Sequence, residues 1–214
     1  MENIPFFTTG DGAASLILRE IPISGRGYIL LLNARPGGAA ALLEECARVC
    51  RMAGARQIFA RGTGVPAHWP VECRVWLLEG ERRTLPRTEA VLQPLTPEQG
   101  EAYRRLMNEK MADVPCASTM GARELRALLS RGGGYFVLLG DRTIGAGQVS
   151  GPEIELLAAL EPGMGGQTLA ALAGAAEGER ILLRCALENT RAMTLYTRLG
   201  FRPVRELERW QEMP

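Results

Sequence analysis

The chain has 214 residues, and its 25 Lys and Arg residues almost balance 24 Asp and Glu residues, giving a formal net charge of +1. A hydrophobic share of 46% with 23% charged residues is typical of a globular protein that buries a core. The near-neutral balance argues against a nucleic-acid-binding surface, which needs clustered basic residues.

The N-terminal segment, the length of the apolar runs and the histidine content further limit the possible classes of protein. The N-terminal segment has no basic stretch followed by a long apolar run, and no apolar run approaches the roughly 20 residues that span a bilayer. We therefore expect a cytoplasmic protein that binds neither membrane nor nucleic acid. His68 is the only histidine, which argues against a Cys/His zinc site or a Ser-His-Asp triad, and we expect no metal.

The first part of the chain contains a β-α-β pattern. Cys46 and Cys50 lie one helical turn apart on the apolar face of an amphipathic helix that runs between Pro36 and Gly54, so we expect both to be buried. Short apolar runs predict strands at 14–23, 27–34, 56–62 and 72–80. A strand, a helix and a strand in this order predict a parallel pair with a right-handed crossover.

A polar segment at 81–89 marks the expected domain boundary, between a smaller domain at 1–86 and a larger one at 87–214. The larger part reads strand, two helices, three strands, helix, strand, helix and strand. The expected ranges, in chain order, are 90–95, 96–111, 121–132, a hairpin over 134–151, then 153–160, 165–178, 180–188, 189–199 and 202–213. This order predicts an α+β protein with a mixed central sheet flanked by helices.

Two stretches, 30–61 and 155–186, share the order apolar strand, Pro-Gly, small-residue helix, Gly, Arg and apolar strand. A degenerate internal duplication explains this similarity. The general likeness of any two β-α-β units explains it equally well, and both interpretations stay open.

The segment "LENTRAMTLYTRLGF" (187–201) and the element order of residues 90–214 resemble the GNAT N-acetyltransferase superfamily. Family members often carry Asn, then Ala, then Leu-Tyr, then Gly-Phe at about this spacing. The matching residues are Asn189, Ala192, Leu195, Tyr196, Gly200 and Phe201. The resemblance covers a little over half of the chain, and it implies the GNAT fold with a partial, degenerate GNAT-like domain before it.

The resemblance implies a transferase: an acyltransferase that moves an acetyl group from acetyl-CoA to a primary amine by direct attack, in a tandem-domain chain. It implies Tyr196 as the acid that protonates the leaving thiolate, and Glu153 or Glu155 as the base. It implies that Leu157, Ala158 and Ala159 pair with the pantetheine arm like an extra strand. We expect a small-molecule or peptide amine as acceptor and leave a homodimer open.

The glycine loop is where the sequence departs from the family pattern. The resemblance implies that CoA binds at Gly163, Gly165, Gly166 and Gln167, where a helix N-terminus holds phosphate, and at Asn189. The basic residue that usually precedes these glycines is missing. The alternative is a catalytically silent GNAT-fold module that binds a ligand or a partner. In that case Tyr196 is a packing residue, Asn189 is only a helix N-cap and the two glutamates are a solvated strand face.

Overall fold

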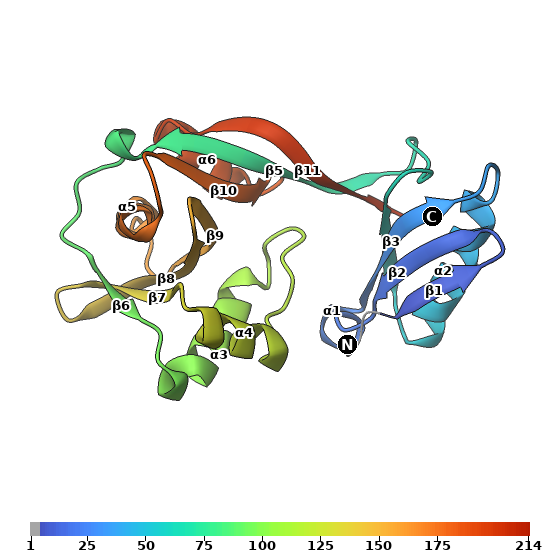
Figure 1. Cartoon of the computed structure of the whole chain (residues 1–214), viewed down its shortest axis with the longest axis horizontal. Coiled ribbons are helices and arrows are strands. Elements are labelled where there is room, and N and C mark those ends of the chain that lie inside the picture. The colour runs from blue at the N-terminus through green and yellow to red at the C-terminus, as the bar shows by residue number, and fades with distance from the viewer. Residues whose placement is uncertain (1–4) are drawn as a thin grey trace. The chain divides into compact units, whose positions relative to one another are not determined.

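The computed structural model describes residues 5–214, which form two compact units. Among these residues, unit 1 comprises 5–74 with Glu208–Pro214, and unit 2 comprises Val75–Leu207. The chain passes between the units within two strands, β5 (Val71–Glu81) and β11 (Arg202–Glu212) (Figure 1). The units therefore divide at a different place from the boundary expected after residue 86, because β5 pairs with a strand of unit 2 from Val75 onward.

Unit 1 is a small sheet covered by one long helix. Its strand order is β1-β2-β3-β4, followed by the end of β11. Strands β3 and β4 are parallel over five residue pairs, which confirms the pair predicted from the β-α-β pattern. Cys46 and Cys50 are fully buried against β2 and β3, as expected. The elements are β1 (Phe6–Thr9), β2 (Gly12–Ile17), α1 (Ile21–Ser24), β3 (Arg26–Ala34), α2 (Ala39–Met52) and β4 (Gln57–Arg61).

The strand expected at 14–23 is only partly correct. Strand β2 ends at Ile17, and a single helical turn, α1, follows. Pro22 lies in the first turn of α1, where its missing N–H is tolerated, and Gly25 closes the turn with a φ of 74°. One continuous apolar run spans both β2 and α1, so the hydrophobic pattern alone does not show where the strand ends and the helical turn begins.

Unit 2 has a mixed sheet in the order β6-β7-β8-β9-β10-β5, with β11 beside β5. Strands β9 and β10 are parallel, whereas β10 runs antiparallel to β5 and the remaining pairs from β6 to β9 are antiparallel. The α+β class with a mixed central sheet is therefore confirmed. The elements are η1 (Arg82–Thr84), β6 (Val91–Pro94), η2 (Pro97–Gln99), α3 (Gly100–Met111), α4 (Ala122–Arg131), β7 (Gly134–Leu139), β8 (Arg142–Ser150), β9 (Glu153–Ala159), α5 (Gly165–Ala175), β10 (Arg180–Ala186) and α6 (Thr190–Arg198).

Two separate apolar clusters cover the two faces of this sheet. On one face α5 packs over β8 and β9 and α6 packs over β10, with Leu169, Leu172 and Ile181 fully buried. On the other face α3 and α4 pack over β8 and β9, where the Tyr103 hydroxyl donates a hydrogen bond of 2.8 Å to the Gly147 carbonyl. Figure 1 shows α5 on one side of β8 and β9, and α3 and α4 on the other. Strand β9 thus lies between two cores, and each of its faces is defined by different helices.

Candidate functional site

The parallel strands β9 and β10 separate after a short paired segment. Within the described residues they pair only at Glu153 with Leu182 and at Ile154 with Leu183. The rest of β9 stays paired with β8 as far as Ala159, so it remains an ordered strand with one neighbour. The sheet therefore splays between β9 and β10.

The splay leaves part of β9 with an open edge. Leu157, Ala158 and Ala159 pair with Gly147, Ala146 and Gly145 of β8, and none of the three has a β10 residue opposite it in the described chain. Backbone groups that point toward β10 there need a partner, since an unpaired polar group away from water is costly. An extended ligand chain that pairs like a strand would meet this requirement.

Three glycines follow this open edge in the sequence, just before and within the first turn of α5. The structure gives a different account of why glycine occupies each position. Gly163 has a φ of 84°, and a Cβ at Gly165 would come within 2.8 Å of Leu195 on α6. At Gly166 neither reason applies: its φ is not positive, and an added Cβ would meet no atom within 4 Å. Packing within the protein therefore does not explain Gly166, and a side chain there would fill open space at a helix N-terminus.

The electrostatics of this helix end suit an anion. The first turn of α5, which includes Gln167, contains no acidic residue, and no side chain caps it. Its free backbone N–H groups and the helix dipole favour negative charge. Glu161, the acidic residue of the preceding loop, forms an ion pair of 2.9 Å with Arg142 at the start of β8. Arg142 therefore offsets the one carboxylate of the loop, although the basic residue of the family pattern is missing.

Asn189 caps α6. Its side-chain oxygen accepts a hydrogen bond of 3.2 Å from the Ala192 backbone N–H. This interaction explains the residue structurally, because Asn is a preferred N-cap. The side-chain amide N–H groups remain available as donors.

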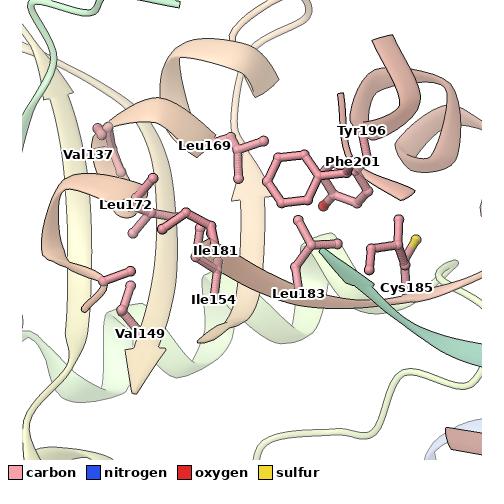
Figure 2. Packing of buried hydrophobic residues seen from close by; sticks show 14 of the residues in the cluster. Val137, Val149, Ile154, Leu169, Leu172, Ile181, Leu183, Cys185, Tyr196 and Phe201 are labelled. Atoms are coloured by element: carbon pink, nitrogen blue, oxygen red, sulfur yellow. The ribbon is translucent and has the colours of Figure 1, made fainter. Parts of the chain in front are cut away.

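Tyr196 lies in the core on the α5 and α6 face, with 7% of its surface exposed. Its ring contacts Phe201 with centroids 6.1 Å apart, and Figure 2 shows it beside Phe201 and above β10. Within residues 5–214 its hydroxyl makes no hydrogen bond. Burial, with a smaller contribution from Cys185, raises the pKa of Tyr196 above its ordinary value. The phenol therefore keeps its proton at neutral pH, and within residues 5–214 no hydrogen-bond acceptor already holds that proton.

Cys185 is the other reactive group near Tyr196. It is buried on β10, and its thiol lies 3.3 Å from the Ala186 carbonyl. Burial, and to a lesser extent the Glu188 carboxylate, raises the pKa of this thiol to about 11. Because the thiolate is the nucleophilic form, a neutral Cys185 is poorly suited to form a covalent intermediate.

Both candidate bases are ion-paired. Glu153 forms a 2.5 Å ion pair with Arg184 of β10, and Glu155 is held by Arg131 at the end of α4, including a hydrogen bond of 3.3 Å. Neither arginine could be identified from the sequence alone. No sequence pattern links them to the glutamates, since Arg131 is 24 residues from Glu155 and Arg184 is 31 residues from Glu153.

The structure places several of the predicted residues on the α5 and α6 face of unit 2. Leu157 packs against the cluster that contains Tyr196, and Leu195, next to Tyr196 in the chain, lies against Gly165 of α5. Glu155 instead is held from α4, on the other face of the sheet. The described part of unit 1 shows no comparable opening, because its parallel strands β3 and β4 stay paired from Arg26 to Leu30.

Two further findings bear on the kind of protein. Within the described chain no group of three or more His, Cys, Asp or Glu side chains could hold a metal ion. Among the same residues no helix has both the length and the apolar character needed to cross a membrane.

Solved structures with the same fold place these features in context. A GCN5-related N-acetyltransferase from Kribbella flavida matches with a TM-score of 0.62 and 16% identity, over 99% of this chain and 90% of that one. A GCN5-related N-acetyltransferase from Sphaerobacter thermophilus matches with a TM-score of 0.58 and 12% identity, over 94% and 76% of the two chains. A conserved protein of unknown function from Staphylococcus epidermidis matches with a TM-score of 0.59 and 11% identity, over 99% and 94%.

At the level of sequence, no family model matches the chain, and no curated protein matches it. The solved structures share its architecture at 11% to 16% identity, which establishes the fold. The reaction has to be argued from the residues of the site. The chain therefore adopts the GNAT fold of the GCN5-related N-acetyltransferases, with its sheet splayed between β9 and β10.

Proposed function

We propose that the protein is an acyl-CoA-dependent N-acetyltransferase that transfers an acetyl group from acetyl-CoA to a primary amine. The splay of β9 from β10 is the observation that carries the proposal. It leaves an ordered strand with one open edge, leading to a helix N-terminus at which Gly166 has no packing reason to be glycine. A long ligand with an amide-bearing arm and a pyrophosphate fits both features.

The residues that would hold acetyl-CoA follow from this fit. Leu157, Ala158 and Ala159 would offer backbone groups to the pantetheine arm. Gly163, Gly165, Gly166 and Gln167 would offer backbone N–H groups to the pyrophosphate, and Asn189 would donate from its amide. Bound acetyl-CoA supplies a thioester carbonyl that a neutral amine can attack.

Residues of this chain would accept the proton of the amine and donate a proton to the leaving sulfur. A β9 carboxylate, Glu153 or Glu155, would take a proton from the attacking amine as the C–N bond forms. Tyr196 would donate its hydroxyl proton to the sulfur as the C–S bond breaks. The free hydroxyl of Tyr196 supports this role, as does its raised pKa, which keeps the proton in place until the thiolate departs. The neutral Cys185 thiol favours direct attack over a covalent acyl-enzyme.

The proposal is tested by incubating the purified chain with acetyl-CoA and a panel of primary amines: spermidine, glucosamine, lysine, tyramine and a short peptide with a free N-terminus. Free CoA is quantified by liquid chromatography. Amine-dependent release of CoA supports the proposal. Acetyl-CoA binding without release by any amine would instead support a silent binding module.

A further inference from the structure

Two arginine–glutamate pairs flank the point at which β9 leaves β10. Glu153, in the last paired segment, is held by Arg184 through contacts of 2.5 Å and 3.2 Å. Glu155, the first residue beyond that segment, is held by both terminal nitrogens of Arg131. The two glutamates are therefore alike in sequence but have partners on different elements, one on β10 and one on α4.

Glu155 occupies a β-bulge. On β8, Gln148 pairs with Leu156 and Val149 pairs with Ile154, so Glu155 is the extra residue on β9. The packing shows the same irregularity: Ile154 belongs to the α5 and α6 cluster, whereas Leu156 packs against the α3 and α4 cluster. Residues two apart on a regular strand would share a face. Bulges re-aim side chains and occur next to active sites, and here the bulge carries one of the candidate bases.

The chain that follows Arg131 is fixed at the same place. Gly133, two residues after Arg131, accepts a hydrogen bond of 2.8 Å at its carbonyl from the Val149 backbone N–H. A Cβ at Gly133 would come within 2.2 Å of the Val149 carbonyl oxygen, so only glycine fits. Val149 is the partner of Ile154, the residue just before the bulge. The end of α4 is thus anchored to the strand that shapes the bulge.

The two carboxylates also differ in accessibility. The Glu155 side chain is 30% exposed, whereas that of Glu153 is 18% exposed and its Oε1 atom is buried. A carboxylate offers about four lone-pair sites, and the two-bond contact with Arg131 uses one on each oxygen of Glu155. Glu155 therefore keeps a free site on each oxygen and is reachable by an amine or a bridging water.

We infer that Arg131 positions Glu155 as the base, and that the Glu153–Arg184 pair instead fastens β9 to β10 at the root of the splay. The inference rests on the proposed acetyl transfer. In that reaction a proton passes from the amine nitrogen to a free lone pair of Glu155. The nitrogen's electron pair forms the C–N bond, and the C–S electron pair leaves with the sulfur. Arg131 touches no reacting atom and acts through Glu155.

The test compares kcat, the KM for acetyl-CoA and the melting temperature of E155Q, R131Q, R131K and R184Q in the full chain. The amine of the panel that releases CoA fastest from the native protein is the acceptor. E155Q should lower kcat by about 10² to 10⁴-fold, the usual contribution of a general base. R131Q should lower kcat by about 10²-fold, the effect of a small misplacement of a catalytic group, and leave the KM for acetyl-CoA unchanged.

Two variants separate positioning from general structure. R131K keeps a cation beside Glu155 but loses the fork geometry, so it should recover part of the kcat lost in R131Q. R184Q breaks the other ion pair, and it should lower the melting temperature while keeping native kcat below the unfolding transition.

The outcomes distinguish the inference from the proposed function. If the native chain releases CoA with an amine but E155Q keeps native kcat, or R131Q loses no more kcat than R184Q, the inference is overturned and acetyl transfer stands. A rise in the KM for acetyl-CoA that matches the fall in kcat of R131Q also overturns it. If the native chain neither binds acetyl-CoA nor releases CoA, both fail together.

Discussion

Gly166 and Gly174 lie on the same helix, α5, and an added Cβ at either position would meet no atom within 4 Å. Only Gly166 lies in the first turn, where the proposed pyrophosphate approaches the backbone. The two glycines therefore form a matched pair: the same methyl group can be added at both, and only one of the two positions should affect a ligand.

G166A and G174A should each leave the fold intact and raise stability by up to about 1 kcal/mol, because Ala is a better helix residue than Gly. G166A should weaken acetyl-CoA binding by about tenfold or more, a loss of roughly 1.4 kcal/mol, since the methyl group occupies the space needed by the phosphates. G174A should bind like the native chain. Equal affinities for the two variants, measured by calorimetry, would remove Gly166 from the site.

A second pair of glycines tests how α4 is anchored. Gly132 and Gly133 both have positive φ, 79° and 85°, but only Gly133 would clash with backbone, at the Val149 carbonyl. G132A should cost about 1–3 kcal/mol, because a φ of 79° with a ψ of −167° is a backbone conformation that only glycine adopts readily. G133A should cost at least about 3 kcal/mol, because the strand must also move. Urea unfolding of both variants measures the difference, and equal losses would contradict the anchoring.

Tyr196 can lose its hydroxyl without losing a hydrogen bond, since the group has no partner among residues 5–214. Y196F should keep native stability within about 0.5 kcal/mol. It should lower kcat by about 10²-fold, because the departing sulfur loses its proton donor. The dissociation constant for acetyl-CoA should hardly change. Native turnover in Y196F would return Tyr196 to a packing role.

The pH dependence follows from the raised pKa of Tyr196. Because burial favours the neutral phenol, the folded-state pKa lies above the unfolded value of about 10. The resulting stability is fully present below about pH 10 and is lost as the pH rises through the folded-state pKa. The kcat of the native chain should therefore show no alkaline loss from Tyr196 below about pH 10. A loss near pH 8 that is absent from Y196F would contradict this.

The pairing of strand β5 with β10 predicts which fragment of the chain folds on its own. Its residues from Val75 to Glu81 pair with β10 along seven positions, so a fragment that begins at residue 87 lacks a strand of unit 2. The fragment 75–207 should unfold cooperatively on heating, whereas 87–207 should show no cooperative transition. Similar melting curves for the two fragments would instead support the boundary expected from the sequence.

Much of the fold could be predicted from local pattern. The element order of unit 2 was confirmed because Gly and Pro mark its turns and because α4 and α6 have clear apolar stripes. The end of β2 at Ile17 could not be predicted, since the apolar run continues into α1. The passage of β5 between the units could not be predicted either, because its pairing with β10 joins residues far apart in the chain.

The candidate site was less predictable than the fold. The resemblance pointed to Tyr196, Asn189 and the β9 glutamates, but it gave no reason to choose between Glu153 and Glu155. The bulge at Glu155 depends on the register with β8, and each arginine partner comes from another element. Such pairings are decided by tertiary packing, which a single sequence does not display.

The central claim is that acetyl-CoA binds in the splay of unit 2, and titration calorimetry of the full chain with acetyl-CoA tests it most directly. The account predicts saturable binding of one acetyl-CoA per chain, because β9 and β10 separate whereas β3 and β4 of unit 1 stay paired. The affinity should fall in G166A and stay native in G174A. The absence of binding at millimolar acetyl-CoA, or the binding of two molecules per chain, would contradict the account.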